Sequence, residues 1–188
     1  MTINRIIAGI FLLGALAAPA FADDIIDAMD AARKAYQSGD LTNAKQSLDL
    51  ASQLIGQKNA EVFATLLPNA LPGWKADKAS TQALGMAGFG ASMASRTYQN
   101  AKGDSVEVQI TGDSAMVAQI AAFFSNPALA GAMGKLVRVG SQRAIQDNDG
   151  NVKMVIANKF MVSVEGSADA AAKLAYAQAI DVAKLSKL

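Results

Sequence analysis

The stretch VKMVIANKFMVSVE, residues 152–165, decides the fold of the C-terminal part of this chain. It holds two short apolar runs, 152–157 and 160–165, built largely from valine, isoleucine, methionine and phenylalanine, and β-branched and aromatic residues favour strands. Asn158 and Lys159 separate the runs, and asparagine is favoured in tight turns. The stretch therefore predicts a β-hairpin with its turn across Asn158-Lys159.

The sequence around this hairpin predicts a mostly antiparallel sheet. Val106, Val108 and Ile110 alternate with polar residues, which is the pattern of a half-buried strand. Further strands are expected at 92–100, 135–140 and 142–146, and helices between Asp113 and Asn126 and after Gly166-Ser167. Because short turns join neighbouring strands, residues 74–188 are predicted to form an α+β domain, a mostly antiparallel sheet with helices packed on one face.

Residues 23–67 predict an N-terminal helical hairpin and a short third helix over 59–67. The face of the first helix is expected to carry Ile25, Ala28, Met29, Ala32, Ala35 and Tyr36. The second helix, which Thr42 is expected to cap, should carry Ala44, Leu48, Ala51 and Ile55 on one face. Two prolines and a glycine make residues 68–73 a linker between the hairpin and the sheet domain.

Several segments carry resemblances to known families. The helical residues 31–54, AARKAYQSGDLTNAKQSLDLASQL, resemble one tetratricopeptide repeat. Arrays of that repeat need about three copies, so a single copy implies a hairpin that packs on the rest of the chain. The element order of 74–188 is similar to the PsbP/Mog1-like fold, which implies a compact sheet with helices. The segments LPGW, SRTY, FFSNP and AIDVAKL resemble an uncharacterised family of secreted proteobacterial proteins, which brings no assigned activity.

Residues 1–22 predict a secretory signal peptide. Arg5 precedes an apolar run, and Ala20-Phe21-Ala22 places small residues at −3 and −1 of a cleavage after Ala22. The run is too short for a comfortable membrane span. The chain has no cysteine for a lipid anchor. The expected product is a periplasmic protein that starts at Asp23 and has no transmembrane segment.

Composition excludes several classes of function. Without Arg5, the 17 basic residues become 16, equal to the 16 acidic residues, and no basic stripe for nucleic acid is present. Histidine and cysteine are both missing, which excludes the usual nucleophilic triads and zinc sites. The composition still allows a catalytic Ser-Lys dyad, but the sequence singles out no pair. Residues 147–151, DNDGN, fail the spacing of a calcium-binding EF-hand loop and predict a turn.

The glycine-rich stretch LGMAGFGASMAS, residues 84–95, allows several interpretations. Its G-x-x-G-x-G spacing reverses the dinucleotide-binding fingerprint, and no helix cap follows, which argues against a phosphate loop. Met86 and Met93 raise the alternative of a Cu(I) site, although methionine also fills gaps in apolar cores. Two interpretations remain, an ordinary loop over the sheet and a flexible apolar flap next to a binding site.

The candidate binding residues are Trp74, Met86, Phe89, Arg96, Tyr98 and Arg143. With Arg138, the arginines Arg96 and Arg143 would place three guanidinium groups on one sheet face, an arrangement that binds anions or an acidic partner. The structural alternatives are a buried tryptophan and a solvated sheet face.

Taken together, these patterns predict a non-catalytic periplasmic binding protein, acting as an accessory factor, adaptor or carrier. The expected partner is an envelope protein or a small apolar or anionic ligand. No cofactor, resident metal or nucleic acid is predicted. Copper handling through methionine is the alternative function, and a hydrolase of unrecognised type is the third.

Overall fold

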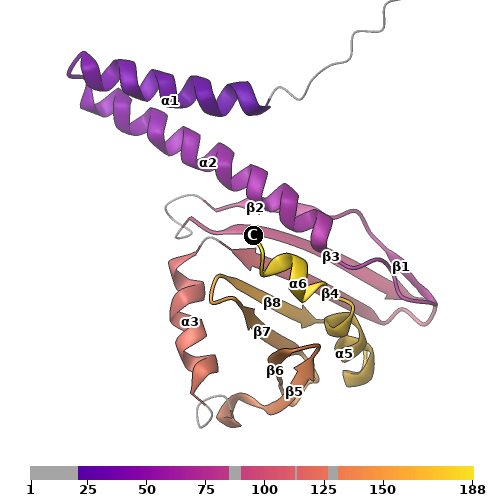
Figure 1. Cartoon of the computed structure of the whole chain (residues 1–188). Helices are drawn as coiled ribbons and strands as arrows, with labels where there is room; N and C mark the ends of the chain where they lie inside the picture. The colour runs from indigo at the N-terminus through magenta and orange to yellow at the C-terminus, as the bar shows by residue number, and fades with distance from the viewer. Residues whose placement is uncertain (1–20, 85–89, 113, 127–130) are drawn as a thin grey trace, which may run out of the picture.

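The structure is a computed structural model that describes residues 21–84, 90–112, 114–126 and 131–188. Within those ranges, eight strands form one antiparallel sheet in the order β1-β3-β4-β8-β7-β6-β5, with β2 beside β3 (Figure 1). The strands are β1 Trp74–Ala76, β2 Ser80–Ala83, β3 Ser92–Asn100, β4 Ser105–Gly112, β5 Lys135–Val139, β6 Gln142–Gln146, β7 Val152–Ile156 and β8 Phe160–Glu165. The helices are α1 Phe21–Gln37, α2 Leu41–Leu66, α3 Ala115–Ser125, α5 Ala170–Gln178 and α6 Val182–Leu185. The predicted α+β class is confirmed. The predicted signal peptide lies outside the described residues except for its last two, which begin α1.

The β7–β8 hairpin that was predicted from residues 152–165 lies inside the sheet, with β4 pairing against β8 and β6 against β7. Its turn falls one residue earlier than predicted. Ala157 and Asn158 have φ of 52° and 56°, and the Lys159 amide donates to the Ile156 carbonyl at 3.1 Å. Positive φ at both central residues defines the hairpin turn that follows the right-handed twist of the strands.

Helices lie on both faces of the sheet. One face carries the main core, in which Phe63 of α2, Tyr176 of α5 and Leu185, the last residue of α6, pack on the sheet. On the other face, Val117 of α3 packs against Val155 of β7. The expectation of helices on one face therefore holds for α2, α5 and α6, but α3 covers the opposite face. The physical reason is that β7 and β8 carry apolar side chains on both faces next to their shared turn, where Val155 and Met161 lie on the α3 face. Both faces need cover there.

Helix α2 is a single helix of 26 residues, so the separate third helix expected over 59–67 does not form. Gly56 lies at the expected break. A Cβ on Gly56 would sit 3.2 Å from the Ala83 Cβ and 3.5 Å from the Ser92 Oγ. The glycine therefore lets α2 pass close to β2 and β3 rather than ending the helix.

The helical hairpin is held together by alanines. Ala28 and Ala32 of α1 and Ala44 and Ala51 of α2 are buried, while α1 lies along the N-terminal part of α2 and away from the sheet (Figure 1). The larger residues expected on the same faces stay in solvent, since Met29, Tyr36, Leu48 and Ile55 are all exposed. Small residues bring the helix axes close, which leaves larger neighbours at the border of the contact. Asp40, not Thr42, caps α2 by accepting from the Asn43 amide at 3.0 Å.

A substitution at Gly112 tests how tightly α2 packs on the sheet. A Cβ there would lie 2.7 Å from the Phe63 Cζ and 2.8 Å from the Phe160 Cδ1, and these two rings already meet edge-on at 5.5 Å. We expect Gly112→Ala to lower the free energy of unfolding by about 1–3 kcal/mol in urea denaturation, because the rings must move. In the control Gly131→Ala, the added Cβ meets no atom within 4 Å, and stability should change by less than about 0.5 kcal/mol. Equal stability of the two variants would contradict the packing.

Candidate functional site

Three predicted binding residues, Trp74, Arg96 and Tyr98, meet at the linker 68–73. The Tyr98 hydroxyl donates to the Pro68 carbonyl at 2.6 Å, and the Arg96 Nη1 donates to the same carbonyl at 3.3 Å. Tyr98 is fully buried. These contacts fix the chain where α2 ends and the sheet begins.

A second tyrosine completes this cluster from the C-terminal helix. The ring of Tyr176 lies 4.4 Å from the ring of Tyr98, and Trp74 meets Tyr176 edge-on at 5.4 Å. The Tyr176 hydroxyl accepts a hydrogen bond from the Leu71 amide at 3.2 Å. Burial raises the pKa of Tyr98 to about 12 and also raises that of Tyr176. The arrangement holds the linker against the sheet, which is a structural role.

The substitution Tyr98→Phe tests this role. Losing the hydrogen bond to Pro68 should lower the free energy of unfolding by about 1–2 kcal/mol at pH 8. Because the folded-state pKa of Tyr98 lies above the usual value of 10.0, the stabilisation is fully present below about pH 10 and is lost as the pH rises through about 12. The difference between the wild type and Tyr98→Phe should therefore shrink over that interval in chemical denaturation. The exposed Tyr36 offers the control Tyr36→Phe, and an equal loss there would contradict the assignment.

The remaining candidates do not join this cluster. Met86 and Phe89 lie outside the described residues. Arg143 on β6 is paired in register with Arg138 on β5, and both project from the face opposite to Arg96. The prediction that three arginines share one sheet face is therefore wrong. Successive residues of a strand point to opposite faces, and the register places Arg96 on the core face and Arg138 and Arg143 on the face that carries α3.

That second face carries a groove of about 730 Å³ beside α3, which is within the usual size of small-molecule sites. Its lining residues come from four parts of the chain: Gln109 of β4, Ile120 and Phe124 of α3, Ala132 and Met133, and Lys153, Met161, Ser163 and Glu165 of β7 and β8. Ile120, Phe124 and Met161 also pack against the small core beneath α3. The side of the groove next to the helix is therefore apolar.

The strand register makes the floor of the groove polar away from α3. Gln109, Ser163 and Lys153 are cross-strand partners in one row, so their side chains project to the same face. The Gln109 Nε2 donates to the Thr111 Oγ1 at 3.2 Å. This row places amide, hydroxyl and ammonium groups beside the apolar side of the groove.

The far end of the groove is acidic. Glu165 is the cross-strand partner of Glu107, and its Oε1 lies 3.2 Å from the Lys153 Nζ. Both side chains of this ion pair are between 40% and 50% exposed, so solvent weakens it. Glu107 borders this end without lining the groove, and its carboxylate together with the Lys153–Glu165 pair gives the three groups one net negative charge.

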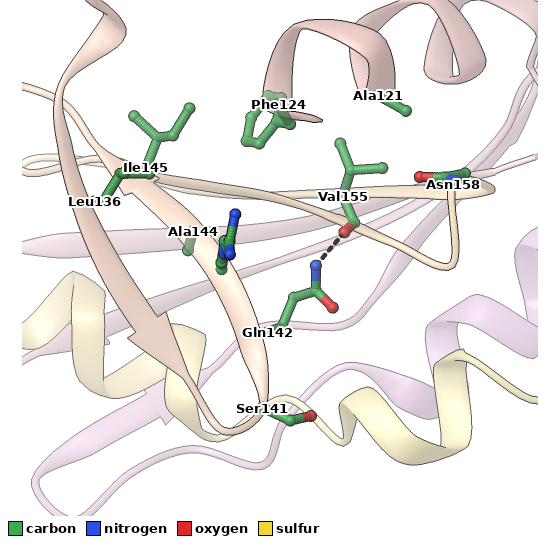
Figure 2. A pocket seen from close by; sticks show the side chains of 10 residues that line it. Ala121, Phe124, Leu136, Ser141, Gln142, Ala144, Ile145, Val155 and Asn158 are labelled. Carbon is green, nitrogen blue, oxygen red and sulfur yellow. Dashed lines mark hydrogen bonds between the residues drawn. The ribbon is translucent and has the colours of Figure 1, made fainter. Parts of the chain in front are cut away.

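A smaller hollow of about 300 Å³ shares Phe124 with the groove. Figure 2 shows Phe124 and Ala121 of α3 above Val155, with Gln142 below it. The Gln142 Nε2 donates to the Val155 carbonyl at 2.7 Å. Arg143 lines this hollow, so among the predicted binding residues that the structure describes it alone lies at a cavity of the α3 face.

The turn at residues 147–151 is organised around a lysine. Lys173 of α5 is buried, and its Nζ donates to the Asp149 carbonyl at 2.8 Å and to the Asn151 Oδ1 at 2.9 Å. Asp147 accepts from the amides of Asp149 and Asn151 and from the Asn151 Nδ2. Burial acts to raise the pKa of Asp147, but these hydrogen bonds, led by that of the Asn151 side chain, lower it. The oxygens of this turn thus hold an ammonium group, and the predicted turn is confirmed.

Three of the methionines that the structure describes lie in the main core or at the groove. Met154 is fully buried in the main core, as expected for a residue that fills gaps. Met133 and Met161 line the groove. In the ranges that the structure describes, no three His, Cys, Asp or Glu side chains are grouped to hold a metal ion.

Comparison with family models, curated proteins and solved structures finds no match for this chain. No helix among the described residues is both long enough and apolar enough to cross a membrane. The groove therefore has to be interpreted from its own chemistry. Sequence reasoning missed it, although apolar residues at successive positions of β7 and β8 were a signal that both faces of these strands are covered.

Proposed function

We propose that this protein is a non-catalytic periplasmic binding protein that holds a small amphipathic ligand in the groove beside α3. The observation that supports the proposal is the division of the groove into an apolar wall from Ile120, Phe124 and Met161 and a polar row beginning at Gln109. A site of this kind holds the ligand through apolar burial and orients it through a few polar groups. The periplasmic location, predicted from residues 1–22, is part of the proposal.

The charges favour a ligand with an uncharged polar head. Glu165 pairs with the Lys153 ammonium, and Glu107, its neighbour on β4, adds a second carboxylate at the border of the polar end. A ligand carboxylate placed there would meet a net negative charge. An uncharged hydroxyl or amide head can still bond to Gln109 and Ser163 without that repulsion. Among the small ligands expected from sequence, the apolar one is therefore favoured over the anionic one.

Binding of the neutral apolar probe N-phenyl-1-naphthylamine tests the proposal. We expect the probe to fluoresce with the wild type and to be displaced by decanol more effectively than by decanoate. The substitution Met161→Gln should weaken probe binding about tenfold, which corresponds to about 1.4 kcal/mol, because an amide replaces an apolar part of the groove floor.

Met93 provides a matched control, since it lies on the same sheet face but does not line the groove. Met93→Gln should change the probe affinity by less than about twofold. Absence of probe binding by the wild type, or equal weakening by both variants, would count against the groove. Stronger displacement by decanoate than by decanol would overturn the preference for an uncharged head.

A further inference from the structure

One flank of the helical hairpin carries exposed apolar residues at seven-residue intervals. On α2 these are Leu41, Leu48, Ile55 and Val62, and on α1 they are Met29 and Tyr36. Leu41, Leu48 and Tyr36 are 65%, 57% and 69% exposed. Seven residues are close to two helical turns, so each series forms a stripe along its helix. An apolar stripe with this period is typical of helices that pack along one another.

The two stripes lie on the same flank of the hairpin. The opposite flank is marked by a hollow that Asp27 and Ala31 of α1 and Leu50 of α2 help to line. Leu48 is two residues from Leu50, and Met29 is two residues from Asp27, so each lies about 200° around its helix from that hollow. We call the set Met29, Tyr36, Leu41, Leu48 and Ile55 the apolar flank.

We infer that the apolar flank is a dimer interface, on which two copies of this chain pack their hairpins face to face as a four-helix bundle. Helical hairpins form such bundles when each contributes one apolar face, and a twofold axis lets the same patch serve both copies. From their exposed fractions, the five residues offer at most about 600 Å² on each copy, so burying them in two copies gives at most about 1,200 Å², the lower end for a specific interface.

The charges along the border are compatible with a second copy. Arg33 follows Met29 by one turn, and its Nη2 lies 3.1 Å from Asp30. Lys45 follows Leu41 by one turn, and its Nζ lies 2.8 Å from Asp49. Because each bordering cation has an acidic partner in its own copy, two identical flanks meet without unbalanced like charges. Residues 23–67 carry seven acids and four bases, which disfavours an anionic lipid surface as the occupant.

Sedimentation velocity of the purified protein from about 1 to 200 µM tests the inference, because a reversible dimer is favoured by mass action as the concentration rises. We expect a concentration-dependent dimer for the wild type. Leu48→Glu should make the protein monomeric throughout. The matched control Leu50→Glu changes a residue with 51% exposure on the opposite flank of the same helix and should leave the dimer intact.

Cross-linking provides a measurement that does not depend on a disruptive variant. The chain has no cysteine, so Leu48→Cys and Leu50→Cys each supply a single thiol. A short bismaleimide should link two copies through position 48 and much less through position 50. A wild type that stays monomeric at 200 µM, a dimer that survives Leu48→Glu, or equal cross-linking at both positions overturns the inference. Capture of anionic vesicles by the wild type but not by Leu48→Glu, without a dimer, would assign the flank to a membrane surface instead.

Discussion

The buried carbonyl of Pro68 is the point on which the arrangement of this protein depends. Pro68 follows the end of helix α2, and its carbonyl would be costly to bury without a hydrogen-bond donor. Tyr98 and Arg96 of β3 both donate to it, and Tyr176 of α5 holds the next part of the linker. Elements from the start, middle and end of the chain are thereby fixed at one corner, which sets the direction in which α2 leaves the sheet.

The second constraint is that β7 and β8 are apolar on both faces next to their shared turn. Met154 and Val155 are neighbours on β7 and point to opposite sides, and both are buried. The main core covers one side, but α3 is short and covers only part of the other. The uncovered remainder is the groove, in which Met161 next to the helix gives way to the polar row through Ser163. The site therefore arises from incomplete coverage of a sheet face rather than from a conspicuous motif.

The hairpin and the groove are two separate places where apolar side chains remain exposed. In the hairpin, Ala44 and Ala51 bring the helices close, which stabilises the pair but leaves Leu48 and Ile55 outside the contact. At the groove, Phe124 and Met161 keep an apolar wall open beside polar strands. The two surfaces belong to different elements, so the proposed assembly through the hairpin and the proposed ligand binding on the α3 face can be tested independently of each other.

The sequence by itself determined the α+β class, the helical hairpin and six of the eight strands that the structure describes, because these follow from local periodicity and turn residues such as Asn158. The short strands β1 and β2 were not predicted. It did not determine which side chains meet. Tyr98 and Tyr176 are 78 positions apart in the chain, and no local pattern distinguishes a tyrosine that binds a ligand from one that holds a linker. The role of Gly56 was similarly ambiguous, since a glycine that ends a helix and a glycine that lets a helix approach a sheet give the same pattern in the sequence. Only the tertiary structure decided these roles, because they depend on contacts between residues distant in sequence.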